Sequence, residues 1–511
     1  MKKIIYSVIL IFALLSCRDD VLETVPTNKA DEKTVFTTVE NAFTALNGMY
    51  RAFFVDGSEW VEYFEDENAG VAALGLAVDL FGDDMSQNEG GSAWFWYDYN
   101  YWVRSEVNST GDRPYAWWNM HYKFINNANF ILANIDNTTG DDNDRNSIKA
   151  QALALRASSY FNLIRLYQRT YIGHQSDPGV PLYTEPTNKD TEGKGRGTVE
   201  EVYTQINSDL DEAITLFQSA SSQYHISHID LYVAYGLKAR VALTQEDWNT
   251  AATNASFARG KPGVSLMSTA DVYTGFNSVS NQEWMWASEV NDEQTLSWTG
   301  FWTHMDAGAG GYAQDSRKCV SRWLYDQIDA NDVRKDWFVD PNTSADDATG
   351  PDFRYNQIKF TIEQAGSWSS DLLYMRMAEM YLIEAEARCM LTSYTTAREL
   401  LDDVVGYKDP NFAATLAAIP SGNTLSLGTA GPVNNLLDLI ILQRRIELWG
   451  EGFRVFDIER LKTGFDRAYA GSNHSIQLTI TDPESWEWIM MIPQKEFDGN
   501  INMNQATDQN P

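Results

Sequence analysis

Apolar side chains recur at helical spacing along much of the chain. Between residues 150 and 167 they include Leu153, Ala157, Tyr160, Ile164 and Tyr167. The spacing i, i+4, i+7, i+11 and i+14 places these five on one helix face. Thr198 and Glu201 have the spacing of a capping box, so we expect a helix to begin there and continue through Leu216. These patterns predict a mainly α-helical protein.

A faint internal repeat relates residues 231–257 to residues 377–403. At a constant offset it aligns Tyr235 with Tyr381, Ala239 with Ala385, Trp248 with Tyr394, and Ala251 with Ala397. Each segment predicts a helix, a short polar turn and a second helix that begins with an aromatic residue. Small alanines let paired helices approach closely, as in tetratricopeptide-like hairpins. Four matching positions are also few enough to arise by chance.

The stretch between these hairpins, residues 260–370, has a different pattern. It is rich in Gly, Asp, Asn and Ser, lacks long helical periodicity and contains seven tryptophans. A second aromatic cluster, at residues 94–102, follows the sequence Asn-Glu-Gly-Gly at 88–91. Aromatic residues outside regular helices and next to Gly and Asn favour loops that display a binding surface.

The two aromatic clusters suit the recognition of neutral glycans. Sugar rings offer apolar C–H faces, which match flat aromatic rings, and hydroxyl rims, which match amides and carboxylates. The candidate ligand-binding residues are Trp94, Trp96, Tyr97, Tyr99, Asn100, Trp298, Trp302 and Tyr312. Large aromatics are highly buried on average, so packing in the core is the alternative for each of them. Asp83 and Asp84 could bond sugar hydroxyls or could be solvated turn residues.

The strongly negative net charge excludes some classes of binding partner. The chain has 71 Asp and Glu against 39 Lys and Arg, a formal net charge of −32. Such a surface repels phosphate backbones and disfavours electrostatic binding to anionic lipid. We therefore expect no nucleic-acid partner.

Motifs for cofactors, metals and catalysis are weak. The three cysteines, Cys17, Cys319 and Cys389, form neither a disulfide framework nor a metal-binding pair. His225 and His228 lack the context of a zinc site, and neither a Gly-x-Ser-x-Gly motif nor a dinucleotide fingerprint is present. We expect no cofactor, no metal and no catalytic residues. A glycoside hydrolase remains an alternative, because with so many acids some pair could have the required spacing.

The N-terminus has the pattern of a bacterial lipoprotein. Two lysines precede an apolar run from Ile4 to Leu15, which is of signal-peptide length and too short to span a bilayer. The sequence Leu-Leu-Ser-Cys at 14–17 has the form of a lipobox, which predicts cleavage before Cys17 and acylation of that cysteine. An ordinary signal peptide cut nearby is the alternative. We expect residues 1–16 to be the signal peptide, 17–35 a lipidated tether and 36–511 the folded domain.

A charged run near the C-terminus contains Arg444, Glu447, Glu451 and Arg454. Their spacing, i, i+3, i+7 and i+10, predicts a ladder of ion pairs on one helix face. We interpret this run as structural pairing that fastens the C-terminal helices, and not as a catalytic group.

Several stretches, in this order, resemble the SusD/RagB family of outer-membrane nutrient-binding lipoproteins. They are residues 22–26, 38–50, 154–167, 374–386 and 444–462, the last beginning Arg-Arg-Ile-Glu-Leu-Trp-Gly-Glu-Gly-Phe-Arg. The resemblance covers nearly the whole chain. It implies four tetratricopeptide-like helix pairs that carry an irregular ligand-binding subdomain.

The same resemblance implies a function. We expect the helical scaffold at about 36–259 and 371–511, the ligand-binding insert at about 260–370, and ligand contacts near 94–101 and 298–312. The expected role is capture of a glycan at the cell surface, without catalysis, for delivery to a SusC-like TonB-dependent transporter in the outer membrane. Some family members capture peptides, so a peptide ligand is an alternative, as is a scaffold that only binds proteins.

Overall fold

The computed structural model describes residues 36–55, 61, 66–88, 94–108, 113–220, 225–342, 354–364 and 366–511. The predicted signal peptide, Cys17 and the tether lie outside these residues. Within the described ranges, no helix is both long enough and apolar enough to cross a bilayer.

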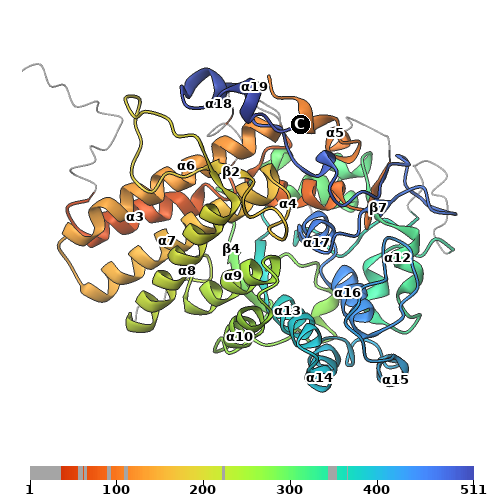
Figure 1. The fold of residues 1–511 in the computed structure, drawn as a ribbon. Helices are drawn as coiled ribbons and strands as arrows, with labels where there is room; N and C mark the ends of the chain where they lie inside the picture. The colour runs from red at the N-terminus through yellow and green to blue at the C-terminus, as the bar shows by residue number, and fades with distance from the viewer. Residues whose placement is uncertain are drawn as a thin grey trace, which may run out of the picture.

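Long helices form an array that occupies one side of the molecule (Figure 1). The array consists of α3 (Val39–Arg51), α6 (Arg113–Asn134), α7 (Asp142–Tyr167), α8 (Val199–Ser219), α9 (Leu231–Thr244), α10 (Trp248–Ala258), α13 (Met377–Met390) and α14 (Tyr394–Val405). From α6 onward, each of these helices packs against the next one. The array confirms the mainly α, tetratricopeptide-like fold, and α7 contains the helix predicted at 150–167.

The repeat found in the sequence corresponds to two helix pairs, α9 with α10 and α13 with α14. The aligned alanines Ala239, Ala251, Ala385 and Ala397 are all fully buried. Side chains this small allow close helix packing, and α10 also packs against α13 although residues 259–376 separate them in sequence. The predicted hairpins are therefore confirmed.

The capping box at the start of α8 is present. The Thr198 hydroxyl accepts a hydrogen bond from the Glu201 amide at 3.1 Å, and the Glu201 carboxylate accepts one from the Thr198 amide at 2.7 Å. These reciprocal bonds satisfy amide groups that the first helical turn leaves without partners. The helix extends to Ser219, slightly beyond the predicted end at Leu216.

The other side of the molecule consists of short elements and long connections. Its helices are α4 (Gly70–Phe81), α5 (Trp96–Tyr99), α11 (Phe301–Met305), α12 (Arg322–Gln327), α15 (Phe412–Ala418), α16 (Leu436–Glu447) and α17 (Arg454–Arg460). Helices α18 (Gln494–Gly499) and α19 (Gln505–Asp508) lie at the top of Figure 1, where α18 contacts α6. Its short 3₁₀ helices are η3 (Trp102–Ser105), η5 (Asp271–Tyr273), η6 (Ser297–Thr299), η7 (Ala307–Ala309), η8 (Tyr312–Gln314), η9 (Val333–Trp337) and η10 (Trp486–Trp488), while η4 (Ile135–Asn137) lies within the array between α6 and α7.

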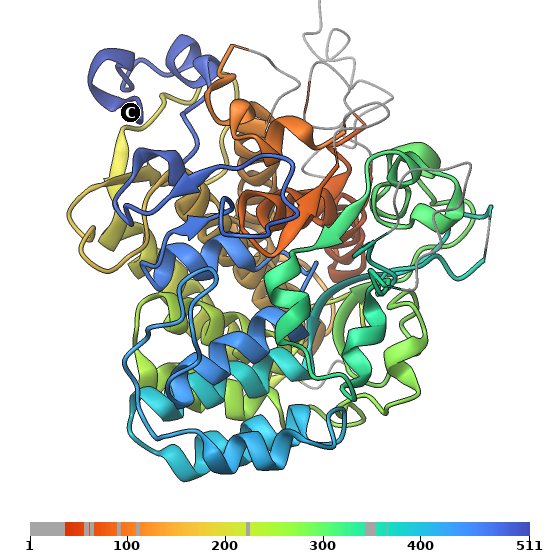
Figure 2. The ribbon, with the colours of Figure 1, turned by 90° about the vertical axis from the view of Figure 1, so that its right-hand side faces the viewer.

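The strands described form two-stranded antiparallel sheets. The pairs are β1 (Met85–Gln87) with β5 (Lys318–Val320), β2 (Pro178–Pro181) with β3 (Arg196–Thr198), β4 (Trp284–Ser288) with β6 (Leu372–Arg376), and β7 (Phe465–Asp466) with β8 (Thr479–Ile480). The β1–β5 pair joins an early segment to the central one, and Figure 2 shows these orange and green segments side by side. This pairing determines where the aromatic clusters meet.

Candidate functional site

Aromatic side chains from both predicted clusters meet at one place. The ring centroids of Trp94 and Tyr312 are 5.3 Å apart, and those of Trp298 and Tyr312 are 5.6 Å apart. Trp368 joins the group from a third segment, with its ring centroid 5.8 Å from that of Trp298. Trp298 is 51% exposed and the other three side chains are half-buried. We call these four residues the aromatic platform.

The β1–β5 pair explains why the two clusters converge. Gln87, the last residue of β1, pairs with Lys318, the first residue of β5. Just beyond the pair, the Asn88 amide group donates to the Asp315 carbonyl at 2.8 Å and its side-chain oxygen accepts from the Arg317 amide at 2.6 Å. The Gln87 side chain also donates to the carbonyl of Trp94 at 2.9 Å. Both aromatic segments are thus attached to the same small sheet.

Buried side chains pack against Tyr312 of the platform and fix its orientation. His304, which is 2% exposed, stacks on Tyr312 with ring centroids 5.3 Å apart and approaches Phe95 edge-on. The Tyr312 hydroxyl donates to the Asp66 carboxylate at 2.5 Å, and the Tyr312 amide donates to the Thr303 hydroxyl at 3.2 Å. Burial holds the pKa of His304 well below its usual value, so this imidazole is neutral. Tyr312 is therefore held in a defined orientation.

The backbone around the platform is strained. Phe95 and Trp368 have φ angles of 64° and 57°, in the left-handed region that bulky residues rarely adopt. Gly311 allows close approach, because a Cβ at this position would lie 2.7 Å from a ring carbon of Trp368 and 2.3 Å from the Thr303 hydroxyl. Such strain costs on the order of 1–3 kcal/mol per residue and is concentrated at functional sites.

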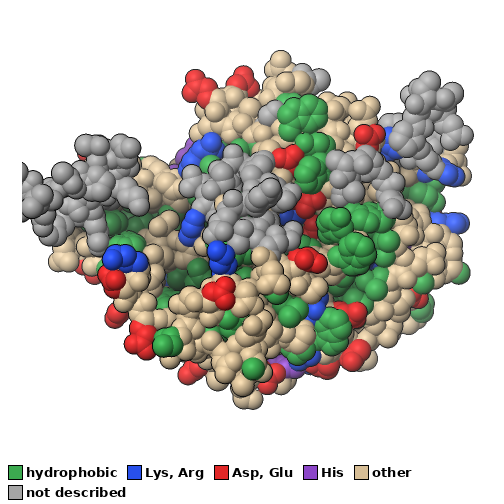
Figure 3. Space-filling view, turned by 90° about the horizontal axis from the view of Figure 1, so that it is seen from above, with side chains coloured by type: hydrophobic (Ala, Val, Ile, Leu, Met, Phe, Trp, Pro, Cys, Tyr) green, Lys and Arg blue, Asp and Glu red, His purple; other side chains and the backbone are tan. Residues whose placement is uncertain are grey.

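The face that carries α5 also displays other hydrophobic side chains. Figure 3 views the molecule from the top of Figure 1, and green side chains gather there in several exposed groups. Tyr97 in α5 is 52% exposed and Trp102 just after it is 65% exposed. Their rings stack with centroids 5.7 Å apart and an interplanar angle of 13°. This pair is a second exposed aromatic surface, a few residues after Trp94 in the same segment.

The other predicted ligand-binding residues do not belong to the aromatic platform. Tyr99 is fully buried and its hydroxyl bonds the His474 ring at 2.7 Å, while Trp302 is 4% exposed and donates to the Ser370 carbonyl at 3.0 Å. Both pack in the core, so we leave them out of the surface that can contact a ligand. Trp96 is half-buried against Tyr99, and half-buried Asn100 accepts from the Trp102 amide at 3.0 Å.

The four charged residues near the C-terminus do not share a helix face, so that prediction is wrong. Helix α16 ends at Glu447 and α17 begins at Arg454. Between them, Gly450 and Gly452 have φ angles of 79° and 82°, which a continuous helix does not allow. Instead of pairing with one another, the four residues pair with other parts of the chain: Arg444 pairs with Asp457 on the next helix, and the other three pair with segments distant in sequence.

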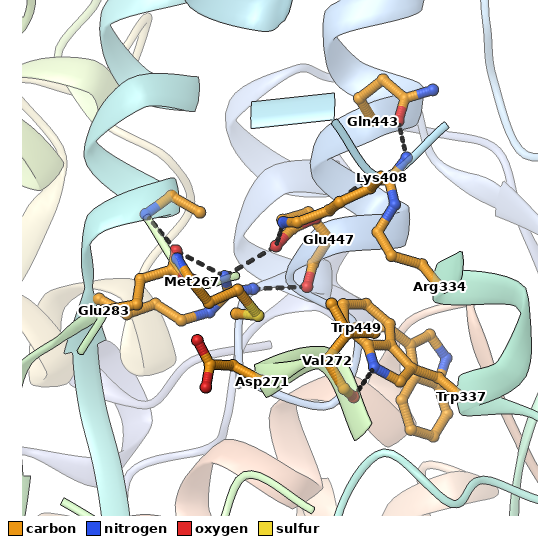
Figure 4. Close-up of polar contacts among 12 residues, drawn as sticks. Met267, Asp271, Val272, Glu283, Arg334, Trp337, Lys408, Gln443, Glu447 and Trp449 are labelled. Carbon is orange, nitrogen blue, oxygen red and sulfur yellow. Dashed lines mark hydrogen bonds and ion pairs between the residues drawn. The ribbon is translucent and has the colours of Figure 1, made fainter. Parts of the chain in front are cut away.

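The buried carboxylate of Glu447 lies among several cationic side chains (Figure 4). Its carboxylate accepts from Lys408 at 2.7 Å, Arg376 at 2.8 Å and Arg334 at 3.0 Å, and all four side chains are at most 1% exposed. Burial alone would raise the pKa of Glu447, but the three cations outweigh burial and hold that pKa well below its usual value. Arg376 also binds the carboxylate of Glu451 at 2.8 Å.

Asp83 and Asp84 belong to the same kind of buried pairing. Asp83 accepts from Arg454 at 2.6 Å and Asp84 accepts from Arg445 at 2.6 Å. The two aspartates are 0% and 4% exposed, so they are neither solvated turn residues nor available to sugar hydroxyls. Burial would raise the pKa of Asp83, but Arg454 and Arg445 lower it to about 2. Arg444 similarly pairs with Asp457 at 2.7 Å.

We name the residues Asp83, Asp84, Arg334, Arg376, Lys408, Arg444, Arg445, Glu447, Glu451, Arg454 and Asp457 the charged cluster. They join α16 and α17 to the segments around α4, η9 and β6, which lie far away in sequence. Buried pairing of this kind between distant segments suits a structural role, as interpreted from the sequence. In the described part of the chain, no three His, Cys, Asp or Glu side chains are grouped as a metal site.

Known protein families resemble this chain over much of its length. Residues 76–243 match a family model described as "Starch-binding associating with outer membrane", and residues 326–511 match the model of the SusD family. The SusD-like protein P2 of Formosa agariphila is 24% identical over 495 residues, which cover 89% of this chain and 90% of that protein.

Solved structures share the fold. A SusD-like carbohydrate binding protein from Bacteroides vulgatus superposes with a TM-score of 0.75 at 26% identity, covering 92% of this chain and 98% of that one. A laminarin binding SusD-like protein superposes with a TM-score of 0.65 at 20% identity, covering 93% and 99% of the two chains. These relatives span nearly the full length of the folded domain.

Proposed function

We propose that this chain, which belongs to the SusD/RagB family, binds a carbohydrate on the aromatic platform. The observation that carries the proposal is the meeting of Trp94, Trp298, Tyr312 and Trp368 at one surface, with Trp298 half exposed. Exposing a tryptophan in water has no benefit for stability, whereas a sugar ring stacked on it would remove apolar area from water on both sides.

Polar groups beside the platform complement this chemistry. The Asp66 carboxylate lies at the hydroxyl of Tyr312, and Ser369 follows Trp368 and pairs with Asp292. Carboxylates of this kind can accept hydrogen bonds from the hydroxyl rim of a sugar ring, and side-chain hydroxyls can both donate to it and accept from it. Neutral rings with acidic neighbours favour an uncharged glycan over an acidic one.

We further propose that the protein acts without catalysis, as a cell-surface lipoprotein that passes its ligand to a SusC-like TonB-dependent transporter. Support comes from the lipobox pattern that ends at Cys17 and from the outer-membrane association in the description of the matching family model. In this scheme residues 260–370 form the ligand-binding subdomain, because three of the four platform residues come from this segment. If the transporter encloses the ligand from a second side, the complex binds more tightly than either protein alone.

The first experiment identifies the ligand class. Purified protein is titrated with pools of neutral oligosaccharides, acidic oligosaccharides and peptides while tryptophan fluorescence and binding heat are recorded, and each mixture is examined for cleavage products. We expect saturable binding of one neutral glycan class and an unchanged ligand. Saturation by peptides alone would support the peptide-capture alternative, and the appearance of shortened glycans would support a hydrolase; either result would contradict the proposal.

A further inference from the structure

A cavity of about 140 Å³ lies between the helical array and the irregular side of the molecule. Its walls come from α6, α7 and α9 on the side of the array, and from α4, α11, β4, β6, α17 and residues 450–453 on the other. None of the four platform residues lines it. The cavity is therefore a separate feature from the proposed glycan site.

Aromatic rings form a large part of the wall of this cavity. Its rings include those of Phe53, Phe124, Phe161, Trp286, Phe301 and Tyr374. Space remains between them because small residues, among them Ala72, Gly75 and Ser158, occupy the facing positions on α4 and α7. Protein interiors are normally packed as densely as organic crystals, so a void of this size lowers stability unless something fills it.

His121 adds polar groups to the lining. Its side chain is 1% exposed, and neither ring nitrogen has a hydrogen-bond partner within the described ranges. Burial, reinforced by Arg165, lowers the pKa of His121 to about 3, so the ring is neutral and offers one donor and one acceptor. Buried polar atoms almost always have partners, so two orphaned nitrogens in a cavity wall point to a ligand.

Arg165 adds a positive charge to the same wall. Its guanidinium lies between the rings of Phe161 and Phe456, 3.9 and 3.8 Å from their centroids. It donates to the Phe161 carbonyl at 3.2 Å and to the Asn162 side chain at 2.6 Å. Among the residues described, no carboxylate lies within ion-pair distance of it, in contrast to the other cavity arginine, Arg240, which pairs with Glu379 at 2.7 Å.

Glu459 is the acid with the strongest electrostatic effect on Arg165, and no ion pair joins the two side chains among the residues described. Glu459 is buried, and burial raises its pKa well above the usual value against the opposing effect of Arg165. The cavity thus combines aromatic rings, a guanidinium that forms no ion pair among the residues described and a neutral imidazole with unused hydrogen-bonding capacity. The carboxylates of Asp371 and Glu451 also line it, but Asp371 accepts from two backbone amides and Glu451 pairs with Lys359 and Arg376.

We propose that this cavity binds a small organic acid whose apolar part is about the size of one six-membered ring. An engineered apolar cavity of about 150 Å³ accommodates benzene, which sets the size of the apolar part. The ligand carboxylate pairs with Arg165, and a ligand oxygen accepts from the N–H of His121. The aromatic wall encloses the ring.

Benzoate, benzamide and acetate are suitable probes, because they separate the contribution of the charge from that of the ring. Binding to purified protein is followed by saturation-transfer NMR and by the shift in melting temperature. We expect benzoate to bind saturably at millimolar concentration, benzamide to bind about tenfold more weakly, and acetate to show no saturation. Equal binding of benzoate and benzamide, or no binding of benzoate, would overturn the proposal.

Two variants test the location. Ser158→Leu fills the space and Arg165→Leu removes the charge, and each is expected to weaken benzoate binding at least about tenfold. Ser219→Leu, at an exposed position of α8, is the matched control for the first variant and leaves binding unchanged. If Arg165→Leu fails to fold, Ser158→Leu alone decides, and unchanged benzoate affinity in that folded variant rejects the cavity as the site.

The platform variant Trp298→Ala separates this inference from the proposed function. We expect it to bind benzoate as the parent protein does, since Trp298 does not line the cavity. Loss of benzoate binding in Trp298→Ala would place the acid on the platform and contradict the inference. Absence of glycan binding to the parent protein would contradict the proposed function alone.

Discussion

The aromatic platform and the charged cluster reverse the usual distribution of side chains. The platform presents large apolar rings at the surface, with Trp298 51% exposed, whereas the charged cluster holds Glu447 and its three cations at 0–1% exposure. Each arrangement is unfavourable unless a partner compensates for it. The cluster already contains its partners within the chain, and the platform does not. This difference indicates that the cluster maintains the fold and that the platform awaits a ligand.

The largest effect should come from breaking the charged cluster. Glu447→Ala would leave Arg334, Arg376 and Lys408 buried without their shared carboxylate, which should lower the free energy of unfolding by about 3–5 kcal/mol. Urea unfolding followed by circular dichroism measures this change. Glu399→Ala, at an exposed position of α14, is the control and should change it by less than about 0.5 kcal/mol. Similar small losses in both variants would show that the cluster does not hold the fold.

Acid should weaken the same cluster. The pKa values of Asp83 and Asp457 are each lowered to about 2 in the folded protein, where arginines outweigh the opposing effect of burial, from an ordinary value of 3.8. A folded pKa below the unfolded one gives stability that is complete above pH 3.8 and is lost as pH falls toward 2. Each aspartate should contribute about 2 kcal/mol. Unfolding free energies measured from pH 6 down to pH 2 test this, and no loss below pH 4 would contradict it.

Removing the most exposed ring of the aromatic platform should lower the affinity for the glycan and leave the stability of the fold nearly unchanged. Trp298→Ala should weaken glycan binding by about 10–30-fold, because a large aromatic at the centre of a binding surface contributes about 1.4–2 kcal/mol. The free energy of unfolding should change by less than about 1 kcal/mol. Phe257→Ala, equally exposed on α10 at 52%, is the matched control and should preserve affinity. A large loss of stability with unchanged affinity would assign Trp298 to the fold.

The smallest effect should come from the second aromatic surface. Tyr97→Ala removes one ring of the stacked Tyr97–Trp102 pair. This pair lies in the same segment as Trp94, but among the ring contacts described none joins it to Trp94. We expect glycan affinity to fall by about 2–5-fold, which corresponds to about 0.5–1 kcal/mol. Calorimetric titration with the same oligosaccharide measures it. A loss as large as that of Trp298→Ala would move the centre of the site to this pair.

Local sequence patterns predicted the parts of the structure that depend on neighbouring residues. The helix containing Tyr160, the capping box at Thr198 and the two hairpins with buried alanines all follow from periodicity and spacing within a few turns. The aromatic segments were also visible, because tryptophans next to Gly and Asn favour loops. The contact between Trp94 and Tyr312 could not be predicted from the sequence, because it depends on the pairing of β1 with β5, which are far apart in the chain.

Sequence patterns could not give the partners of charged and aromatic side chains. Arg445 binds Asp84 across a separation of 361 residues, and the spacing of Arg444, Glu447, Glu451 and Arg454 wrongly indicated partners within one helix. Tyr99 and Trp302 are buried whereas Trp298 is exposed, and this difference depends on which other parts of the folded chain cover each ring. Trp368 was one aromatic among many, and its left-handed backbone has no sequence signal because it is not a glycine.

The central claim is that a glycan binds on the aromatic platform, and a crystal structure of the protein with the oligosaccharide found by titration tests it most directly. We predict a sugar ring in van der Waals contact, at about 4 Å, with the indole rings of Trp298 and Trp368, and hydroxyl groups bonded near Asp66. An oligosaccharide bound elsewhere, with these two rings uncovered, would contradict the account.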